Sequence, residues 1–203
     1  MVFTGRIAGL GTTSGLRAVV GMWAQSPFGP FADVMVEMRS GHRMLLAPSA
    51  EIADFVSSTY GFDETLLVPV TASLDAWNET KILVVEAGPL RIRADVGARS
   101  ILGYAAALLP RRLAVHPGWL RAVSPVAARL SPGVRTAGSA QDGRREFYGV
   151  TDIWRIDSAV VSWDGCDAGG LAQIRPPVRF GFSSVPSRPS VATVQTTVLM
   201  EQS

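Results

Sequence analysis

Short segments in which apolar and polar residues alternate constrain the fold of this chain more than any other feature. Leu90–Val96 alternates apolar and charged residues without interruption, and Val34 and Val36 alternate with Asp33 and Glu37. A period of two residues is that of a β-strand with one face on a core and the other in solvent. Glycine occurs 20 times and proline 13 times among the 203 residues, so breaks are frequent. The pattern predicts a β-rich chain of many short strands.

About nine strands are expected in all. A hairpin is predicted around residues 39–42, because a turn-forming Arg-Ser-Gly-His segment separates two apolar runs. The glycine-rich segment 9–15 is interpreted as a flexible turn, because no helix follows it. Further predicted strands include Thr65–Val70, Lys81–Val85, Glu146–Ile156, Val178–Ser183 and Ser190–Met200.

Helical patterns are few and short. Ser49 is a candidate N-cap for a helix that carries Ile52, Phe55 and Val56 on one face and ends at Gly61. Residues 98–109 and 117–130 also favour helix. Most connections are too short for parallel crossovers. The expected fold class is therefore β-rich α+β, an antiparallel β-barrel or two-sheet sandwich of about nine strands with inserted short helices.

The length of 203 residues fits one domain, 1–203, with a basic helical insertion at about 98–135. Charge is uneven along the chain. Residues 91–145 contain ten arginines and only two acids, Asp95 and Asp142, whereas residues 1–90 have a net charge of −4. A basic stretch interleaved with apolar residues is typical of a surface that meets an anionic membrane or an acidic partner. The alternative is that these arginines pair with the acidic remainder of the chain.

Cysteine and targeting patterns favour a cytoplasmic protein. Cys166 is the single cysteine, which excludes an internal disulfide. No signal-peptide pattern follows the N-terminus, and the longest apolar run, Ile101–Leu109, is too short for a transmembrane segment.

The residue inventory supports neither a metal site nor a cofactor site. His42 and His116 are the only histidines, and nothing in the sequence brings them together. The phosphate-loop sequence Gly-Lys-Ser/Thr and the hydrolase elbow Gly-x-Ser-x-Gly are both missing from the chain. We expect no metal and no cofactor.

The first functional hypothesis is a binding protein whose barrel or cleft holds a small, largely apolar ligand. If Glu146–Ile156 is one regular strand, Tyr148, Asp152 and Trp154 lie on one face and line the site. A carboxylate among large apolar groups is costly to bury and is typical of recognition or catalysis. A bulge at Gly149 would instead turn Asp152 outward.

Two other classes of function stay open. One is an enzyme of unknown reaction that uses Asp152 or Glu86 as acid or base, with Glu86 sharing a strand face with Ile82 and Val84. The other is an interaction module that presents basic residues to an anionic membrane or acidic partner; its surface comprises Arg111, Arg112, Arg121 and Arg129. Nucleic acid is the weakest candidate partner, because the net charge of the chain is only +2. An exposed sheet edge would favour a homodimer.

Overall fold

The computed structural model describes residues 1–77, 80–108, 110, 118, 137–139, 144–181 and 185–200. Within these residues it contains thirteen strands, all in one sheet, and two short α-helices. The helices are α1 (Ala50–Ser57) and α2 (Ile101–Ala107). The strands are β1 (Val2–Thr12), β2 (Arg17–Gln25), β3 (Phe31–Glu37), β4 (Arg43–Ala47), β5 (Glu64–Leu67), β6 (Val70–Trp77), β7 (Thr80–Ala87), β8 (Leu90–Arg99), β9 (Ala137–Ser139), β10 (Arg144–Trp163), β11 (Cys166–Asp167), β12 (Leu171–Ala172) and β13 (Ser190–Met200).

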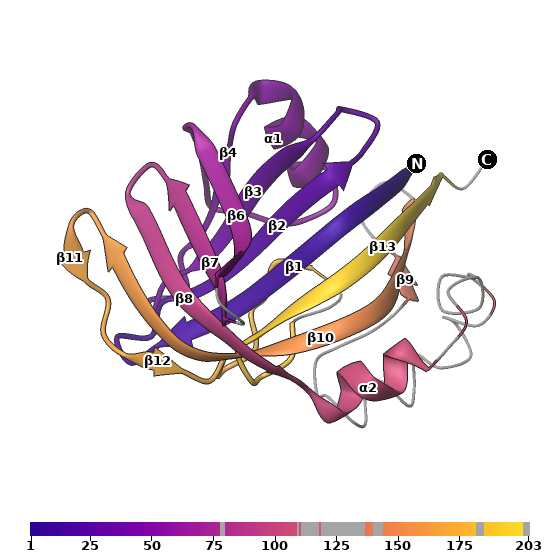
Figure 1. The fold of residues 1–203 in the computed structure, drawn as a ribbon. Coiled ribbons are helices and arrows are strands. Elements are labelled where there is room, and N and C mark those ends of the chain that lie inside the picture. Colours follow the sequence, from indigo (N-terminus) through magenta and orange to yellow (C-terminus); the bar gives the residue numbers. More distant parts are fainter. Residues whose placement is uncertain are drawn as a thin grey trace.

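The sheet curls into a half-barrel (Figure 1). Ten strands follow the order β5-β4-β3-β2-β1-β13-β10-β8-β7-β6, while β9, β11 and β12 are short side pairings. Only the β4–β5 pair is parallel among the pairs that the described strands form. Strand β10 is 20 residues long and pairs with β13 along its first part and with β8 along its second. This long strand joins the two halves of the curl.

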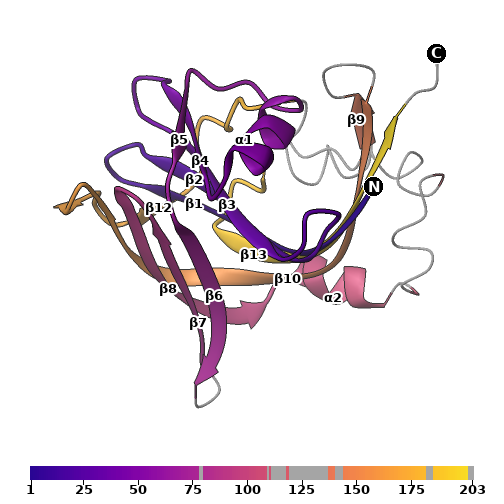
Figure 2. The same cartoon turned by 90° about the horizontal axis from the view of Figure 1, so that it is seen from above.

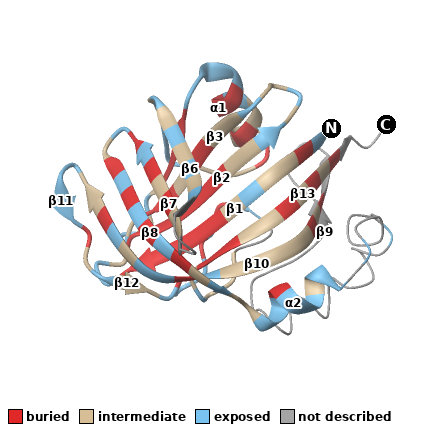
Figure 3. Ribbon diagram, in the orientation of Figure 1, coloured by how far each residue is buried: buried red, intermediate tan, exposed pale blue. Residues whose placement is uncertain are grey.

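Side chains fill the interior of the curl. One buried cluster joins Leu10, Val20 and Val36 of β1–β3 to Leu83 and Ile92 of β7 and β8. The alternation predicted for Leu90–Val96 is confirmed, since β8 alternates buried and exposed residues along most of its length (Figure 3). The interior of the curl is therefore a packed hydrophobic core.

The opposite face of β1–β4 is covered as well. Helix α1 packs Ile52, Ala53 and Val56 against Leu45 and Ala47 of β4. Figure 2 shows α1 and strands β6–β8 on opposite sides of the central strands. The part of the sheet formed by β1–β4 is therefore buried on both faces.

Several predicted elements agree with the structure. Strands β3 and β4 form the expected antiparallel hairpin. The hydroxyl oxygen of Ser49 accepts a hydrogen bond from the Ile52 amide at 3.3 Å and caps α1 as predicted. The helix ends at the C-cap Ser58, three residues before Gly61. The β-rich, mostly antiparallel character of the chain is confirmed.

Other predictions were wrong. The glycine-rich segment 9–15 is not a flexible turn in its first part, because Gly9–Thr12 completes β1 and pairs with β2 and β12. The single strand predicted at 65–70 is divided between β5 and β6. No strand occurs at 178–181, the described part of the segment 178–183. Of the basic insertion, only α2 and a few isolated residues lie within the described part of the chain.

Candidate ligand-binding cleft

A cleft of about 160 Å³ lies on the α1 side of the sheet. Its floor is formed by β1, β2, β3, β10 and β13, and its cover by Phe55 and Val56 of α1 together with Tyr60 and the segment that contains Val178 and Phe180. Alternate residues of β13 face the cleft, as the period of two predicted for this strand requires. The cleft therefore lies between the sheet and its cover, and not inside the curl.

Aromatic rings form one wall of the cleft. Phe3 stacks on Phe55 with ring centroids 5.1 Å apart, and it meets Trp23 edge to face at 5.7 Å. Phe28 extends the cluster, with its centroid 5.0 Å from that of Phe55. Aromatic pairs at these distances are stabilised beyond their buried area. The wall is thus both apolar and fixed in position by ring packing.

Asp33 places a carboxyl group on this apolar surface. The residue is 4% exposed and lines the cleft. Its Oδ1 accepts a hydrogen bond of 3.0 Å from Trp23 Nε1, which is its only hydrogen bond among the described residues. Burial raises the pKa of Asp33 to about 6, and the bond from the Trp23 indole opposes that rise. A carboxylate has room for about four donors, so most of its capacity is unused.

Gly21 makes the contact between Asp33 and Trp23 sterically feasible. It pairs with Asp33 across β2 and β3, while Trp23 pairs with Phe31. A Cβ atom at position 21 would lie 2.7 Å from Trp23 Nε1 and would also collide with Asp33 Oδ1. The indole and the carboxyl group therefore meet above a residue that has no side chain.

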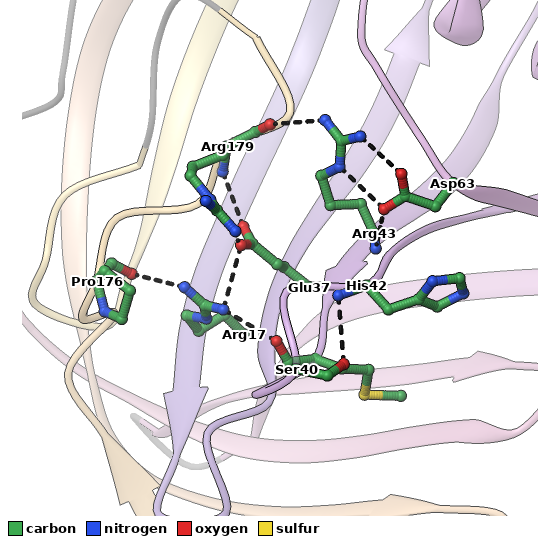
Figure 4. Close-up of polar contacts among 9 residues, drawn as sticks. Arg17, Glu37, Ser40, His42, Arg43, Asp63, Pro176 and Arg179 are labelled. Atoms are coloured by element: carbon green, nitrogen blue, oxygen red, sulfur yellow. Dashed lines mark hydrogen bonds and ion pairs between the residues drawn. The ribbon is translucent and has the colours of Figure 1, made fainter.

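Glu37 lies on the same face of β3 as Asp33, four residues further along the strand, and has a different environment. It is fully buried, and its Oε1 lies 3.3 Å from Arg17 Nη2 and 3.2 Å from Arg179 Nε (Figure 4). The backbone amide of Arg179 donates a 2.8 Å hydrogen bond to Oε2. Arg17 also donates to the carbonyl oxygen of Pro176 at 3.0 Å. The network attaches the covering segment to the sheet and leaves Glu37 with two cations, where Asp33 has none.

Hydroxyl groups complete the polar part of the cleft. Thr196 of β13 is 4% exposed, lines the cleft, and its Oγ1 has no hydrogen-bond partner among the described residues. The phenol groups of Tyr60 and Tyr148 hydrogen-bond to each other across the cleft lining. Buried polar atoms are normally satisfied, so the unpartnered Thr196 hydroxyl requires an explanation.

The structure separates the three residues predicted to line one site. Tyr148 lines the cleft with Val150, but β10 has an irregularity between Val150 and Asp152. Val150 pairs with Val194, which faces the cleft, whereas Asp152 pairs with Thr193 on the other face. The expected common face of Tyr148, Asp152 and Trp154 was therefore wrong. Strand β10 does contain a bulge, as the alternative prediction proposed, but the bulge lies between Val150 and Asp152 and not at Gly149.

Asp152 and Trp154 belong instead to a charged cluster on the far side of the sheet. Asp152 forms an ion pair of 2.9 Å with Arg99. Lys81 Nζ lies 3.0 Å from the centre of the Trp154 ring, close enough for a cation–π interaction. Burial lowers the pKa of Lys81, nearby Arg6 and Arg99 lower it further, and Asp152 opposes them. Asp152 is thus the counter-ion of Arg99 and does not face the cleft.

Two other candidate residues that the structure describes, Glu86 and His42, lie apart from the cleft. The side chain of Glu86, the second carboxylate considered as an acid or base, is 61% exposed and pairs with Arg91 at 3.0 Å. His42 is an exposed partner of Glu64 at 2.9 Å. His116 and the four arginines of the predicted anionic-partner surface lie outside the described residues: Arg111, Arg112, Arg121 and Arg129.

Two kinds of feature are absent from the residues that the structure describes. No three side chains of the types that bind metals come together in a potential metal site. No helix among these residues combines the length and the apolar character needed to cross a membrane.

Comparison with protein-family models, with characterised proteins and with solved structures gives no significant match. The site must therefore be interpreted from its own geometry.

Sequence reasoning missed Asp33 because it placed Asp33 and Glu37 on the solvent face of β3. The alternation itself was correct, since Val34 and Val36 do face the filled interior. The signal for a second core was present in Phe31 and Met35, which share the face of the two acids and line the cleft with Asp33. A strand face that carries two large apolar residues beside two acids is more consistent with a buried face than with a solvent-exposed one.

Proposed function

We propose that this protein binds a small, largely apolar molecule in the cleft beneath α1. The observation that supports the proposal most strongly is a concave, mainly apolar surface onto which a few polar groups converge, as in small-molecule sites generally. The volume of about 160 Å³ is close to that of an engineered apolar cavity, about 150 Å³, that accommodates benzene. The expected ligand is therefore of the size of one aromatic ring with a short substituent.

The cleft is held open by its supporting contacts. The Phe3–Phe55 stack fixes one wall, and the Glu37 network fixes the segment that carries Phe180. A preformed site loses less free energy on ordering than a site that must assemble around its ligand. This arrangement favours a binding function for the cleft.

Filling the cleft is expected to abolish binding. Ala192 lines the floor on β13, and Ala192→Leu places three further carbon atoms there. Toluene serves as a neutral probe. At a concentration of about 100 times its Kd, it is expected to stabilise the wild type by about 2.7 kcal/mol and the filled variant by nothing measurable. The thermal midpoint with and without toluene measures the difference.

Ala105→Leu on α2 is the matched control, because it makes the same chemical change at an exposed position. It is expected to keep the toluene response of the wild type. A response that survives in Ala192→Leu would contradict the proposed site. Native mass spectrometry of freshly purified protein adds an independent check, since a retained ligand appears as an extra mass that is lost on denaturation.

A second candidate function rests on α2. Large apolar side chains of α2 and of its C-cap residue face solvent, with Ile101 88% exposed, Tyr104 59% and the C-cap Leu108 85%. Exposed apolar residues next to an arginine-rich sequence are typical of a helix that lies on an anionic membrane surface. The second proposal is that α2 attaches the protein to anionic lipid.

Charged substitutions on α2 test this second proposal. Ile101→Glu combined with Leu108→Glu is expected to reduce co-sedimentation with phosphatidylglycerol vesicles by roughly tenfold or more, because two apolar contacts are lost and like charges repel. Ala105→Glu controls for added charge at an exposed position that is not a large apolar residue. Equal binding by the wild type to phosphatidylcholine vesicles, or no effect of the double substitution, would contradict it.

A further inference from the structure

Two buried carboxylates on one strand differ in a way that points to the chemistry of the ligand. Glu37 and Asp33 lie on the same face of β3, and both are less than one-tenth exposed. Glu37 has two arginines and a backbone amide. Asp33 has one indole N–H and a surface on the cleft. Because a buried charge is normally paired, the missing partner of Asp33 is expected to come from outside the chain.

A second and independent observation concerns Thr196. Its hydroxyl oxygen is buried, has no partner among the described residues, and belongs to a side chain that lines the same cleft. A hydroxyl oxygen can accept a hydrogen bond as well as donate one. Asp33 pairs with Gly21, Gly21 with Ile7, and Ile7 with Ala192, so Thr196 lies three strands across the sheet and four residues along β13 from Asp33. The two polar groups therefore belong to separate parts of the cleft.

The electrostatics of the cleft favour a cation. Among the described residues that line the cleft, Asp33 is the only acidic or basic side chain, so none of these residues carries a charge that would repel or replace a bound cation. The other titratable groups of the lining are the phenols of Tyr60 and Tyr148, which are hydrogen-bonded to each other. Aromatic faces such as that of Trp23 attract cations as well. A neutral apolar molecule would bury Asp33 further and leave it unpaired.

We propose that the cleft is specific for small aromatic amines, whose protonated nitrogen pairs with Asp33 while the ring occupies the apolar wall. This inference rests on the proposed function and names the ligand class of the same site. An ammonium group has three N–H donors and no acceptor. It therefore supplies the donors that the Asp33 carboxylate lacks within the cleft. The apolar volume sets the size of the ring, and the carboxylate sets its charge.

Three probes of similar size separate charge from shape. Benzylamine, benzyl alcohol and toluene differ only in the group attached to the ring carbon. At about pH 8, where Asp33 is ionised, benzylamine is expected to bind the wild type roughly 10- to 100-fold more tightly than either neutral probe, because a hydrogen bond to a charged group contributes more than a neutral one. Isothermal titration calorimetry measures all three affinities under one condition.

Two variants test which cleft residue causes the preference for benzylamine. Asp33→Asn keeps a carbonyl oxygen for Trp23 and removes the charge, and it is expected to abolish the preference for benzylamine while toluene binding stays within about twofold. Thr196→Val keeps the shape of the side chain and is expected to leave the benzylamine preference unchanged, because Thr196 lies too far from Asp33 to contact the same ammonium group. Glu86→Gln removes an exposed carboxylate and serves as the charge control.

The outcomes are distinguishable. Equal affinities of the wild type for all three probes, or a benzylamine preference that survives in Asp33→Asn, would overturn the amine specificity while leaving the cleft as a binding site. Binding of none of the three probes would overturn the proposed function as well. A preference that is lost in Asp33→Asn and kept in Thr196→Val supports both.

Discussion

Asp33→Asn is expected to stabilise the protein by about 2–3 kcal/mol at neutral pH in the absence of ligand. The pKa of Asp33 is about 6 in the folded chain against 3.8 for an ordinary aspartate. Because the folded-state pKa is raised, the contribution of Asp33 to stability is fully present below about pH 4 and is lost as the pH rises through about 6. A shift of about two pKa units corresponds to about 3 kcal/mol.

Urea unfolding of both proteins between about pH 4 and pH 8 measures this effect. The gap in unfolding free energy between variant and wild type is expected to be small near pH 4 and to reach its full size above pH 6. Parallel profiles across this range would contradict the account of Asp33. Asp63→Asn is the control, and it is expected to lower the unfolding free energy at neutral pH, whereas Asp33→Asn raises it. The reason is that the Arg43 guanidinium holds the pKa of Asp63 well below its usual range.

Glu37→Gln is expected to cost about 3–5 kcal/mol, the second large effect. The substitution leaves Arg17, which is 4% exposed, in the interior without its counter-charge. It also weakens the attachment of Arg179, on the segment that covers the cleft. Glu86→Gln on the exposed Arg91 pair is the control, expected to cost less than about 1 kcal/mol. Unfolding in urea at neutral pH measures both.

A double variant keeps this prediction testable if Glu37→Gln fails to fold. Arg17→Met with Glu37→Leu removes both charges and replaces them with apolar side chains of similar size. Replacement of a buried ion pair in this way is often nearly neutral, so the double variant is expected to be more stable than Glu37→Gln. The opposite order would mean that the hydrogen bonds of Arg17 to Pro176 and Met38 contribute more than the ion pair.

Local patterns predicted local structure well. The Ser49 cap, the β3–β4 hairpin and the β8 alternation all depend on residues close in sequence, and all three are present. The shape of the sheet depends on contacts that no local pattern encodes. Strand β1 pairs with β13 from the other end of the chain, so the glycine-rich end of β1 was taken for a turn. Glycines there lie where other segments approach, as Gly9 does beneath Val185.

The candidate site was predictable only in part. The structure places Tyr148 in the lining of an apolar cleft that also contains a buried carboxyl group, and a binding role for Tyr148 stays a prediction. The carboxylate is Asp33 and not Asp152, because one irregularity in β10 turns Asp152 towards Arg99. A bulge of one residue changes the face of every later side chain, and its position depends on the pairing with β13.

Methyl-resolved NMR of the protein titrated with benzylamine tests the central claim most directly, because the two faces of the sheet carry separate sets of methyl groups. Val19, Val56 and Val194 line the cleft, whereas Leu83 and Val85 belong to the filled interior. The account predicts saturable shifts for the cleft methyls, essentially unchanged interior methyls, and loss of the response in Ala192→Leu. Shifts centred on the interior, or no saturable shift on either face, would contradict it.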